Sequence, residues 1–129
     1  MGAIDYRIAP FPSDGELDRL WRTAWGGPLG RSYQPVLERS LTHVGAYEAD
    51  LLVGFVNLAW DGGIHAFILD TCTDPAFRKR GIAREMVRDA VAVGRDRGIE
   101  WVHVDYEPAL EPFYRACGFR PSAAGVMRL

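Results

Sequence analysis

The first forty residues change from a short alternating pattern to a helical one. Residues 4–9 are half apolar and are followed by a Pro-, Ser- and Gly-rich segment at residues 10–15, which predicts an edge strand and a turn. Apolar residues then recur at helical spacing, with Ser13 or Asp14 as the N-cap, until the Gly-Gly-Pro sequence at residues 26–28 ends the helix. Residues 29–40 fit a second short helix or a packed loop equally well.

From residue 42 the pattern is typical of β-strands. It predicts strands at residues 43–47, 51–60 and 64–73, because the short segments between them carry the Asp and Gly residues of hairpin turns. Three consecutive strands joined in this way form an antiparallel meander.

A long amphipathic helix is predicted after the third of these strands, with Gly98 as its stop. Residues 99–105 then alternate as a buried strand. A strand-helix-strand crossover is right-handed, so the strand at Trp101 should lie parallel to the strand at Phe67. The apolar stripe of the helix consists of Ala83, Met86, Val87, Ala90, Val91 and Gly94.

The C-terminal part of the pattern is shorter. Residues 107–116 predict a short helix with proline near its start and Gly118 after its end, and residues 119–129 predict one or two last strands. The order of elements therefore predicts an α+β fold, and 129 residues suit one domain.

Composition excludes several classes of function. The chain is 48% hydrophobic with a net charge of −2, which argues against a nucleic-acid-binding domain, and its apolar runs are far shorter than the roughly 20 residues of a membrane-spanning helix. The N-terminus carries no secretory pattern, so we expect a cytoplasmic protein. Cys72 and Cys117 have neither the spacing of a disulfide framework nor that of a metal site, and we interpret both as buried thiols.

The segment before the long helix carries the clearest chemistry. Arg78, Lys79 and Arg80 place three cations at the positive end of a helix dipole, where acidic residues are normally favoured. A bound phosphate would remove this repulsion, and Gly81 and Ala83 would let backbone N–H groups approach it. The alternative is a solvated basic loop, but its position between a buried strand and an amphipathic helix favours an anion site.

Two motifs in this part of the chain resemble those of the GNAT superfamily of N-acetyltransferases. The first is Arg78-x-x-Gly81-x-Ala83 after Asp74-Pro75, similar to the family's acetyl-CoA pyrophosphate motif. The second is the aromatic-Tyr-x-x-x-Gly-Phe pattern of residues 113–119. The resemblance implies one GNAT domain over residues 1–129, a three-layer α+β fold with helices on both faces of a twisted, mostly antiparallel sheet of six to seven strands, and a central parallel pair that splays apart.

The same resemblance implies where acetyl-CoA binds. The pantetheine arm would pair with the backbone between the splayed strands, around Cys72 and Thr73, and the pyrophosphate would lie on the basic turn. No metal is implied. The expected cofactor-binding residues are Cys72, Thr73, Arg78, Lys79, Arg80, Gly81, Ile82 and Ala83.

The expected catalytic residues are Tyr114 and Asp70. Tyr114, with an ordinary pKa of about 10 against about 8.5 for a thiol, can donate a hydrogen bond to a departing thiolate, although its ring could also serve only the core. Asp70 interrupts an apolar strand, so it either faces an acceptor cleft as a base or has a buried structural partner. Secondary candidates for the base are His103, Asp105 and Glu107, His65 is expected to be a strand-end residue, and an acyl-cysteine route through Cys72 lacks an adjacent base.

These observations predict transfer of an acetyl group to a primary amine of a small molecule or peptide. The alternative is a non-catalytic acyl-CoA-binding sensor or interaction module. Neither nucleic acid nor a membrane is an expected partner, and exposed strand edges allow a homodimer. Five aromatic residues could line an acceptor pocket but are more often found in cores: Trp21, Tyr33, Tyr47, Trp60 and Trp101.

Overall fold

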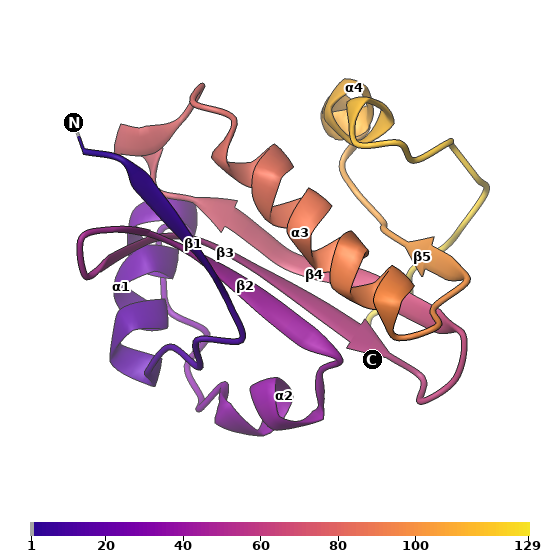
Figure 1. Ribbon diagram of the computed structural model, residues 1–129, viewed down its shortest axis with the longest axis horizontal. Helices are drawn as coiled ribbons and strands as arrows, with labels where there is room; N and C mark the ends of the chain where they lie inside the picture. Colours follow the sequence, from indigo (N-terminus) through magenta and orange to yellow (C-terminus); the bar gives the residue numbers. More distant parts are fainter. Residues whose placement is uncertain (1) are drawn as a thin grey trace.

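The strands of the protein pair in sequence order within one sheet (Figure 1). The computed structural model describes residues 2–129, and in this range the order is β1-β2-β3-β4-β5. Neighbouring strands are antiparallel except β4 and β5, which are parallel, as the crossover rule predicted. The strands are β1 (Ile4–Ile8), β2 (Thr42–Glu48), β3 (Leu51–Trp60), β4 (His65–Thr73) and β5 (Trp101–His103).

Helices cover both faces of this sheet. Helix α3 packs on β2, β3 and β4, whereas α1 packs on β3 and β4 from the opposite side. Adjacent residues of β3 show the two faces, because Val53 belongs to the α3 core and Leu52 to the α1 core. The helices are α1 (Asp14–Trp25), α2 (Gln34–Arg39), α3 (Ile82–Asp96) and α4 (Glu111–Ala116), with 3-10 turns η1 (Pro75–Phe77) and η2 (Pro108–Leu110).

The predicted start and end of the first helix are confirmed. Ser13 is the N-cap of α1, and its hydroxyl accepts from the Glu16 N–H while the Glu16 carboxylate accepts from the Ser13 N–H. Gly26 ends the helix at a φ of +88°, which glycine adopts without steric cost. Of the two alternatives for residues 29–40, the structure has the helix, since α2 occupies part of this segment.

Helix α3 lies unusually close to the sheet at one point. A Cβ atom on Gly54 of β3 would lie 2.9 Å from Met86 Cε and 3.2 Å from Ile82 Cγ2. Met86 and Ala90, from the predicted apolar stripe, are fully buried. This contact fixes the height of α3, and therefore of its N-terminus, above the sheet.

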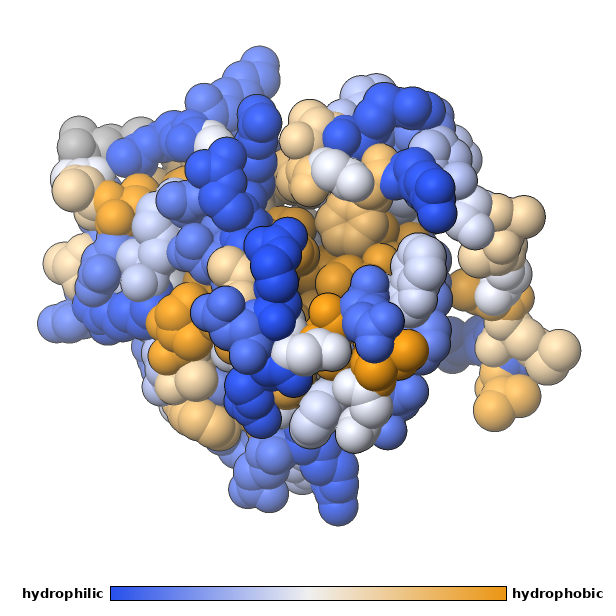
Figure 2. Space-filling view, turned by 45° about the vertical axis from the view of Figure 1, so that its right-hand side comes forward, coloured by the Kyte–Doolittle hydropathy of each residue, from blue (hydrophilic) through white to orange (hydrophobic). Residues whose placement is uncertain are grey.

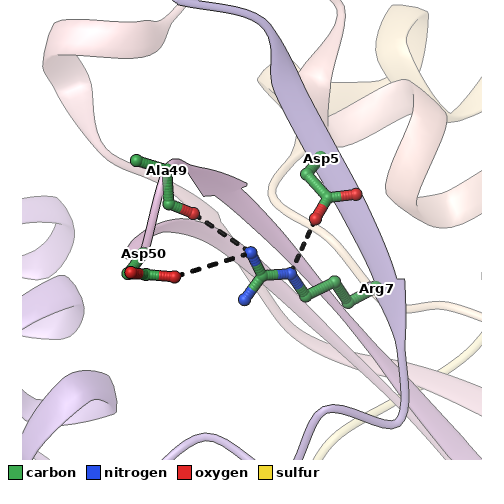
Figure 3. Close-up of polar contacts among 4 residues, drawn as sticks. All are labelled: Asp5, Arg7, Ala49 and Asp50. Atoms are coloured by element: carbon green, nitrogen blue, oxygen red, sulfur yellow. Dashed lines mark hydrogen bonds and ion pairs between the residues drawn. The ribbon is translucent and has the colours of Figure 1, made fainter.

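Strand β1 is held to the hairpin between β2 and β3 by one arginine (Figure 3). The Arg7 guanidinium donates to Asp5 Oδ2 at 2.8 Å and to the Ala49 carbonyl at 3.1 Å, and it lies 3.9 Å from Asp50 Oδ1. The same group lies 4.0 Å from the centroid of the Tyr47 ring. These contacts add side-chain support to the backbone pairing of β1 with β2.

Two predictions about the C-terminal third were wrong. The sheet has five strands among the described residues rather than six to seven, because residues 119–129 form no strand and Val126 and Met127 are 83% exposed. A segment becomes a strand only when it pairs with a neighbouring strand and buries one face, and residues 119–129 pair with no strand of the described sheet. The last paired strand is also shorter than predicted, since β5 covers only residues 101–103.

The predicted helix at residues 107–116 is divided in two. A 3-10 turn, η2, precedes α4, and Pro112 falls in the first turn of α4. Proline is tolerated there because the first N–H groups of a helix have no intrahelical acceptor. Gly118 follows at a φ of +101° and turns the chain out of the helix.

Candidate active site

The parallel strands β4 and β5 separate part-way along their length. Their pairs are His65 with Trp101, Ala66 with Val102 and Phe67 with His103, and none follows although β4 continues to Thr73. Figure 2 turns this side of the molecule forward and shows a hollow in its surface, with hydrophilic residues on either side and hydrophobic residues at its base. The C-terminal half of β4 therefore borders an opening.

A β-bulge interrupts β4 beside this opening. Asn57 and Phe55 of β3 pair with Leu69 and Cys72, so that Asp70 and Thr71 lie together opposite one residue of β3. Asp70 has a φ of +56°, a left-handed conformation that costs a non-glycine residue of the order of 1 kcal/mol. The bulge turns these two adjacent residues out of the regular alternation of the strand.

Asp70 has a direct partner from the segment between α1 and α2. The Tyr33 hydroxyl donates to Asp70 Oδ2 at 2.6 Å, and Tyr33 is 3% exposed whereas Asp70 is exposed. Burial, and secondarily the Asp70 carboxylate, raise the pKa of Tyr33 far above its ordinary value. Tyr33 therefore stays protonated and remains a hydrogen-bond donor over the whole physiological pH range.

Tyr114 of α4 lies next to Thr71 of the bulge, on the face of the sheet that α3 covers. It is 6% exposed, and its ring stacks on Tyr106 with centroids 5.0 Å apart and meets Phe113 edge-on. Burial raises the pKa of Tyr114, an effect that the neighbouring Thr71 hydroxyl partly offsets. The phenol is thus held next to the bulge in its neutral, proton-donating form.

The two candidate catalytic residues approach the opening from opposite faces of the sheet. Tyr114 belongs to the core cluster beneath α3, and Tyr33, the partner of Asp70, belongs to the cluster beneath α1. Asp70 and Thr71 are adjacent in the bulge. Asp70 therefore contacts Tyr33 on the α1 face, whereas Thr71 lies beside Tyr114 on the α3 face.

The basic turn connects β4 to α3. Asp74 begins it, with its carboxylate accepting from the Ala76 N–H at 3.0 Å and lying 3.5 Å from the Arg19 guanidinium. Lys79 and Gly81 both have left-handed φ values, +62° and +75°, with Arg80 between them. Such alternation is typical of turns whose successive N–H groups form an anion-binding concavity.

This turn fits an anionic group. Helix α3 has Gly81 as its N-cap and no side-chain cap hydrogen bond, so its first N–H groups are left without a capping acceptor. Nothing lies within 4 Å of the position of a Cβ on Gly81, and Arg78, Lys79 and Arg80 are all exposed. The Arg80 guanidinium reaches the Gly2 carbonyl at 3.0 Å.

Two of the expected cofactor-binding residues face the core with their side chains. Ile82 is 2% exposed in the α3 cluster and Cys72 is 6% exposed in the α1 cluster, so only their backbones are available to a ligand. Burial raises the pKa of Cys72 to about 12, which keeps it a thiol and disfavours an acyl-cysteine route. Cys117 is half-buried, so its interpretation as a buried thiol was wrong.

The secondary candidates for the base lie outside the bulge, on β5 and in the segment that follows it. His103 and His65 contact each other, with Nδ1 of His65 and Nε2 of His103 2.8 Å apart, at the paired end of β4 and β5. Asp105 is exposed after β5, and its charge contributes to the raised pKa of Tyr114. Glu107 is exposed at the start of η2.

The contact that sequence reasoning missed is the one between Tyr33 and Asp70. The sequence indicates Tyr33 only as a core or pocket aromatic, and 37 positions separate it from Asp70, so no local spacing could indicate the pair. Of the other aromatics, Trp21 and Tyr47 are buried whereas Trp101 is 52% exposed.

Comparison with known proteins agrees with this geometry. The model of the Acetyltransferase (GNAT) family matches residues 7–119. The protein belongs to the GNAT acetyltransferase family. An uncharacterized N-acetyltransferase ycf52-like protein from Prochlorococcus marinus is 28% identical to this GNAT chain over 109 residues, which are 81% of the chain but only 61% of that relative's length.

Solved structures share the fold of this GNAT chain. A GNAT family acetyltransferase from Streptococcus pneumoniae superposes with a TM-score of 0.81 at 19% identity, covering 98% of both chains. The aminoglycoside N-acetyltransferase AAC(6')-Iy, solved in complex with CoA, gives 0.77 at 17% identity, covering 100% of this chain and 95% of its own. At these identities the likeness concerns the fold.

Two further properties concern residues 2–129 as a whole. Across this range no helix is both long and apolar enough to cross a membrane. In the same described range, His, Cys, Asp and Glu side chains form no group of three or more that could hold a metal ion.

Proposed function

We propose that this GNAT chain is an N-acetyltransferase that transfers an acetyl group from acetyl-CoA directly to a primary amine of a small molecule or peptide. The observation that carries the proposal is the β4 bulge at the opening between β4 and β5. It places a carboxylate, Asp70, toward the α1 face and lies beside a neutral phenol, Tyr114, on the α3 face.

The basic turn would hold the pyrophosphate of acetyl-CoA. The N–H groups at Gly81, Ile82 and Ala83 would donate to it, and the three cations would neutralise its charge. The unpaired edge of β4 at Cys72 and Thr73 offers backbone groups to the pantetheine amides. When bound there, acetyl-CoA supplies the activated acetyl thioester.

Asp70 and Tyr114 then have complementary roles in moving protons. An amine must be neutral to attack, and Asp70 would orient its ammonium form and receive a proton from it. Tyr114 would donate a hydrogen bond to the departing thiolate, and its raised pKa supports this role because it keeps the proton available at neutral pH. Removing the Tyr114 hydroxyl should therefore slow turnover without weakening CoA binding.

Several wider expectations remain predictions. They are that residues 1–129 act as one acetyltransferase domain, that the protein is cytoplasmic, that nucleic acid and membranes are not its partners, and that its strand edges allow a homodimer. The net charge of −2 supports the expectation about nucleic acid. The unpaired edge of β5 is compatible with a dimer.

Free-thiol release from acetyl-CoA tests the function directly. The protein is incubated with acetyl-CoA and a panel of primary amines, polyamines, aminosugars and peptides, and the Tyr114→Phe variant is run in parallel. We expect amine-dependent thiol release that Tyr114→Phe lowers about 10² or more in kcat, in line with loss of general acid catalysis, with CoA affinity unchanged. CoA binding without thiol release for any amine would favour the sensor alternative.

A further inference from the structure

Tyr33 is fixed in place by contacts at both its backbone and its ring. Its N–H donates to Asp14 Oδ1 at 3.0 Å, and the Gln34 side chain donates to the same oxygen. Its ring meets Trp21 and Phe55 edge-on, at centroid distances of 5.0 and 5.7 Å. The hydroxyl at the end of this packed ring therefore has a defined position before any ligand binds.

Asp70 lacks this kind of support from its own strand. It is exposed, it lies in the bulge, and its φ of +56° is one that the backbone adopts only under constraint from its surroundings. The only hydrogen bond that its side chain makes to the rest of residues 2–129 is the 2.6 Å bond from the Tyr33 hydroxyl to Oδ2. The same bond engages Oδ2, so Oδ1 of this exposed residue keeps its capacity to accept a hydrogen bond.

We propose that Tyr33 is the positioning residue of the acceptor side, which holds the Asp70 carboxylate with Oδ1 directed to the incoming amine. This inference rests on the proposed function. Tyr33 acts through Asp70 rather than on the substrate, because its hydroxyl is buried and already donates to Oδ2. Because one oxygen of the Asp70 carboxylate is already held, the side chain loses less conformational entropy when the amine binds.

The buried surroundings of Tyr33 make the bond persistent. The raised pKa of Tyr33 excludes the phenolate form, which would repel the carboxylate. The fully buried Asn57 beside Tyr33 lowers the pKa of Tyr33, but burial and the Asp70 carboxylate together raise it by more.

The test compares Tyr33→Phe with Tyr47→Phe. Both residues are buried in the α1 core cluster, and each change removes one hydroxyl, but it is Tyr33 whose hydroxyl donates to Asp70. With an amine that the wild-type protein acetylates, we expect Tyr33→Phe to lower kcat/KM for the amine about ten-fold, as loss of a hydrogen bond to a charged group does, with the KM for acetyl-CoA unchanged. Tyr47→Phe should stay within about two-fold of wild type.

A double-mutant cycle separates positioning from packing. In an Asp70→Ala background, Tyr33→Phe should change kcat/KM by less than about two-fold, because the group it positions is gone. An equal loss in both backgrounds would overturn the inference, as would wild-type kinetics for Tyr33→Phe or for Asp70→Ala while the wild-type protein turns over. Wild-type protein that acetylates no amine would instead overturn the proposed function, and this inference with it.

Discussion

Replacing Gly81 with alanine tests whether the basic turn is a phosphate site. Gly81 is the N-cap of α3 with a φ of +75°, and nothing lies within 4 Å of a Cβ placed there. Gly98 follows the other end of the same helix with a φ of +88° and equally open surroundings. Gly98→Ala is therefore a matched control that introduces the same backbone strain far from the turn.

The cost to stability should be nearly the same for the two variants. A left-handed conformation costs alanine about 1–2 kcal/mol more than glycine, and the lower entropy of the unfolded chain returns about 0.4–1 kcal/mol. Neither new methyl group meets a neighbouring atom, so no steric term is added. Each variant should lose about 1 kcal/mol of unfolding free energy, which corresponds to a melting temperature lower by about 4 °C.

The cost to ligand binding should differ. A methyl group on Gly81 stands where the amides of the turn would meet a pyrophosphate, and loss of one hydrogen bond to a charged group weakens binding about ten-fold or more. Urea unfolding followed by tryptophan fluorescence gives the stabilities, and isothermal titration calorimetry with free CoA gives the Kd of each variant. We expect a higher Kd for Gly81→Ala alone.

One result would refute the argument. If Gly81→Ala and Gly98→Ala lost the same stability and both bound CoA as the wild type does, the turn would be a solvated basic loop. If Gly81→Ala lost far more stability than Gly98→Ala, the assumption that both sites are sterically open would be wrong.

Two further predictions concern stability. Burial lowers the pKa of His43 to about 4, so His43 makes no contribution to the pH dependence of stability above about pH 6.5. As the pH falls from 6.5 toward 4, the unfolded chain binds a proton that the folded chain does not. The free energy of unfolding should therefore fall by up to about 3 kcal/mol. Urea unfolding at pH 7.5 and 4.5 should show this loss reduced in His43→Gln, and an identical pH dependence in both proteins would contradict it. Arg19→Met removes the cation beside Asp74, whose side chain is 8% exposed, together with a hydrogen bond to the Leu52 carbonyl, and should cost about 1–2 kcal/mol. Arg22→Met, which breaks the exposed pair with Asp18, should cost about 0.5 kcal/mol or less when both variants are compared by urea unfolding, and equal losses would refute the distinction.

Local features of the fold could be predicted because their causes are local. The N-cap at Ser13 or Asp14, the glycine stops at Gly26 and Gly98, and the hairpin turns between β2, β3 and β4 each depend on residues within a few positions of one another. The basic turn is of the same kind, because helix dipole, cations and glycine are all contained in residues 78–83.

Features that depend on a distant partner could not be predicted in this way. Residues 119–129 were predicted as one or two strands, yet whether a segment becomes a strand depends on an available edge, and in the structure these residues lie mostly exposed. The length of β5 depends likewise on where β4 diverges from it, after the pair of Phe67 and His103.

For the candidate site, the sequence by itself determined the chemical groups and the basic turn before α3, because these follow from residue type and short-range spacing. Only the tertiary structure decided how the groups meet. The bulge that turns Asp70 toward Tyr33 and leaves Thr71 beside Tyr114 results from the pairing of β3 with β4 and from helices packed on opposite faces. Side chains 37 and 43 positions apart are brought together by burial of the two cores, a long-range effect that no local pattern records.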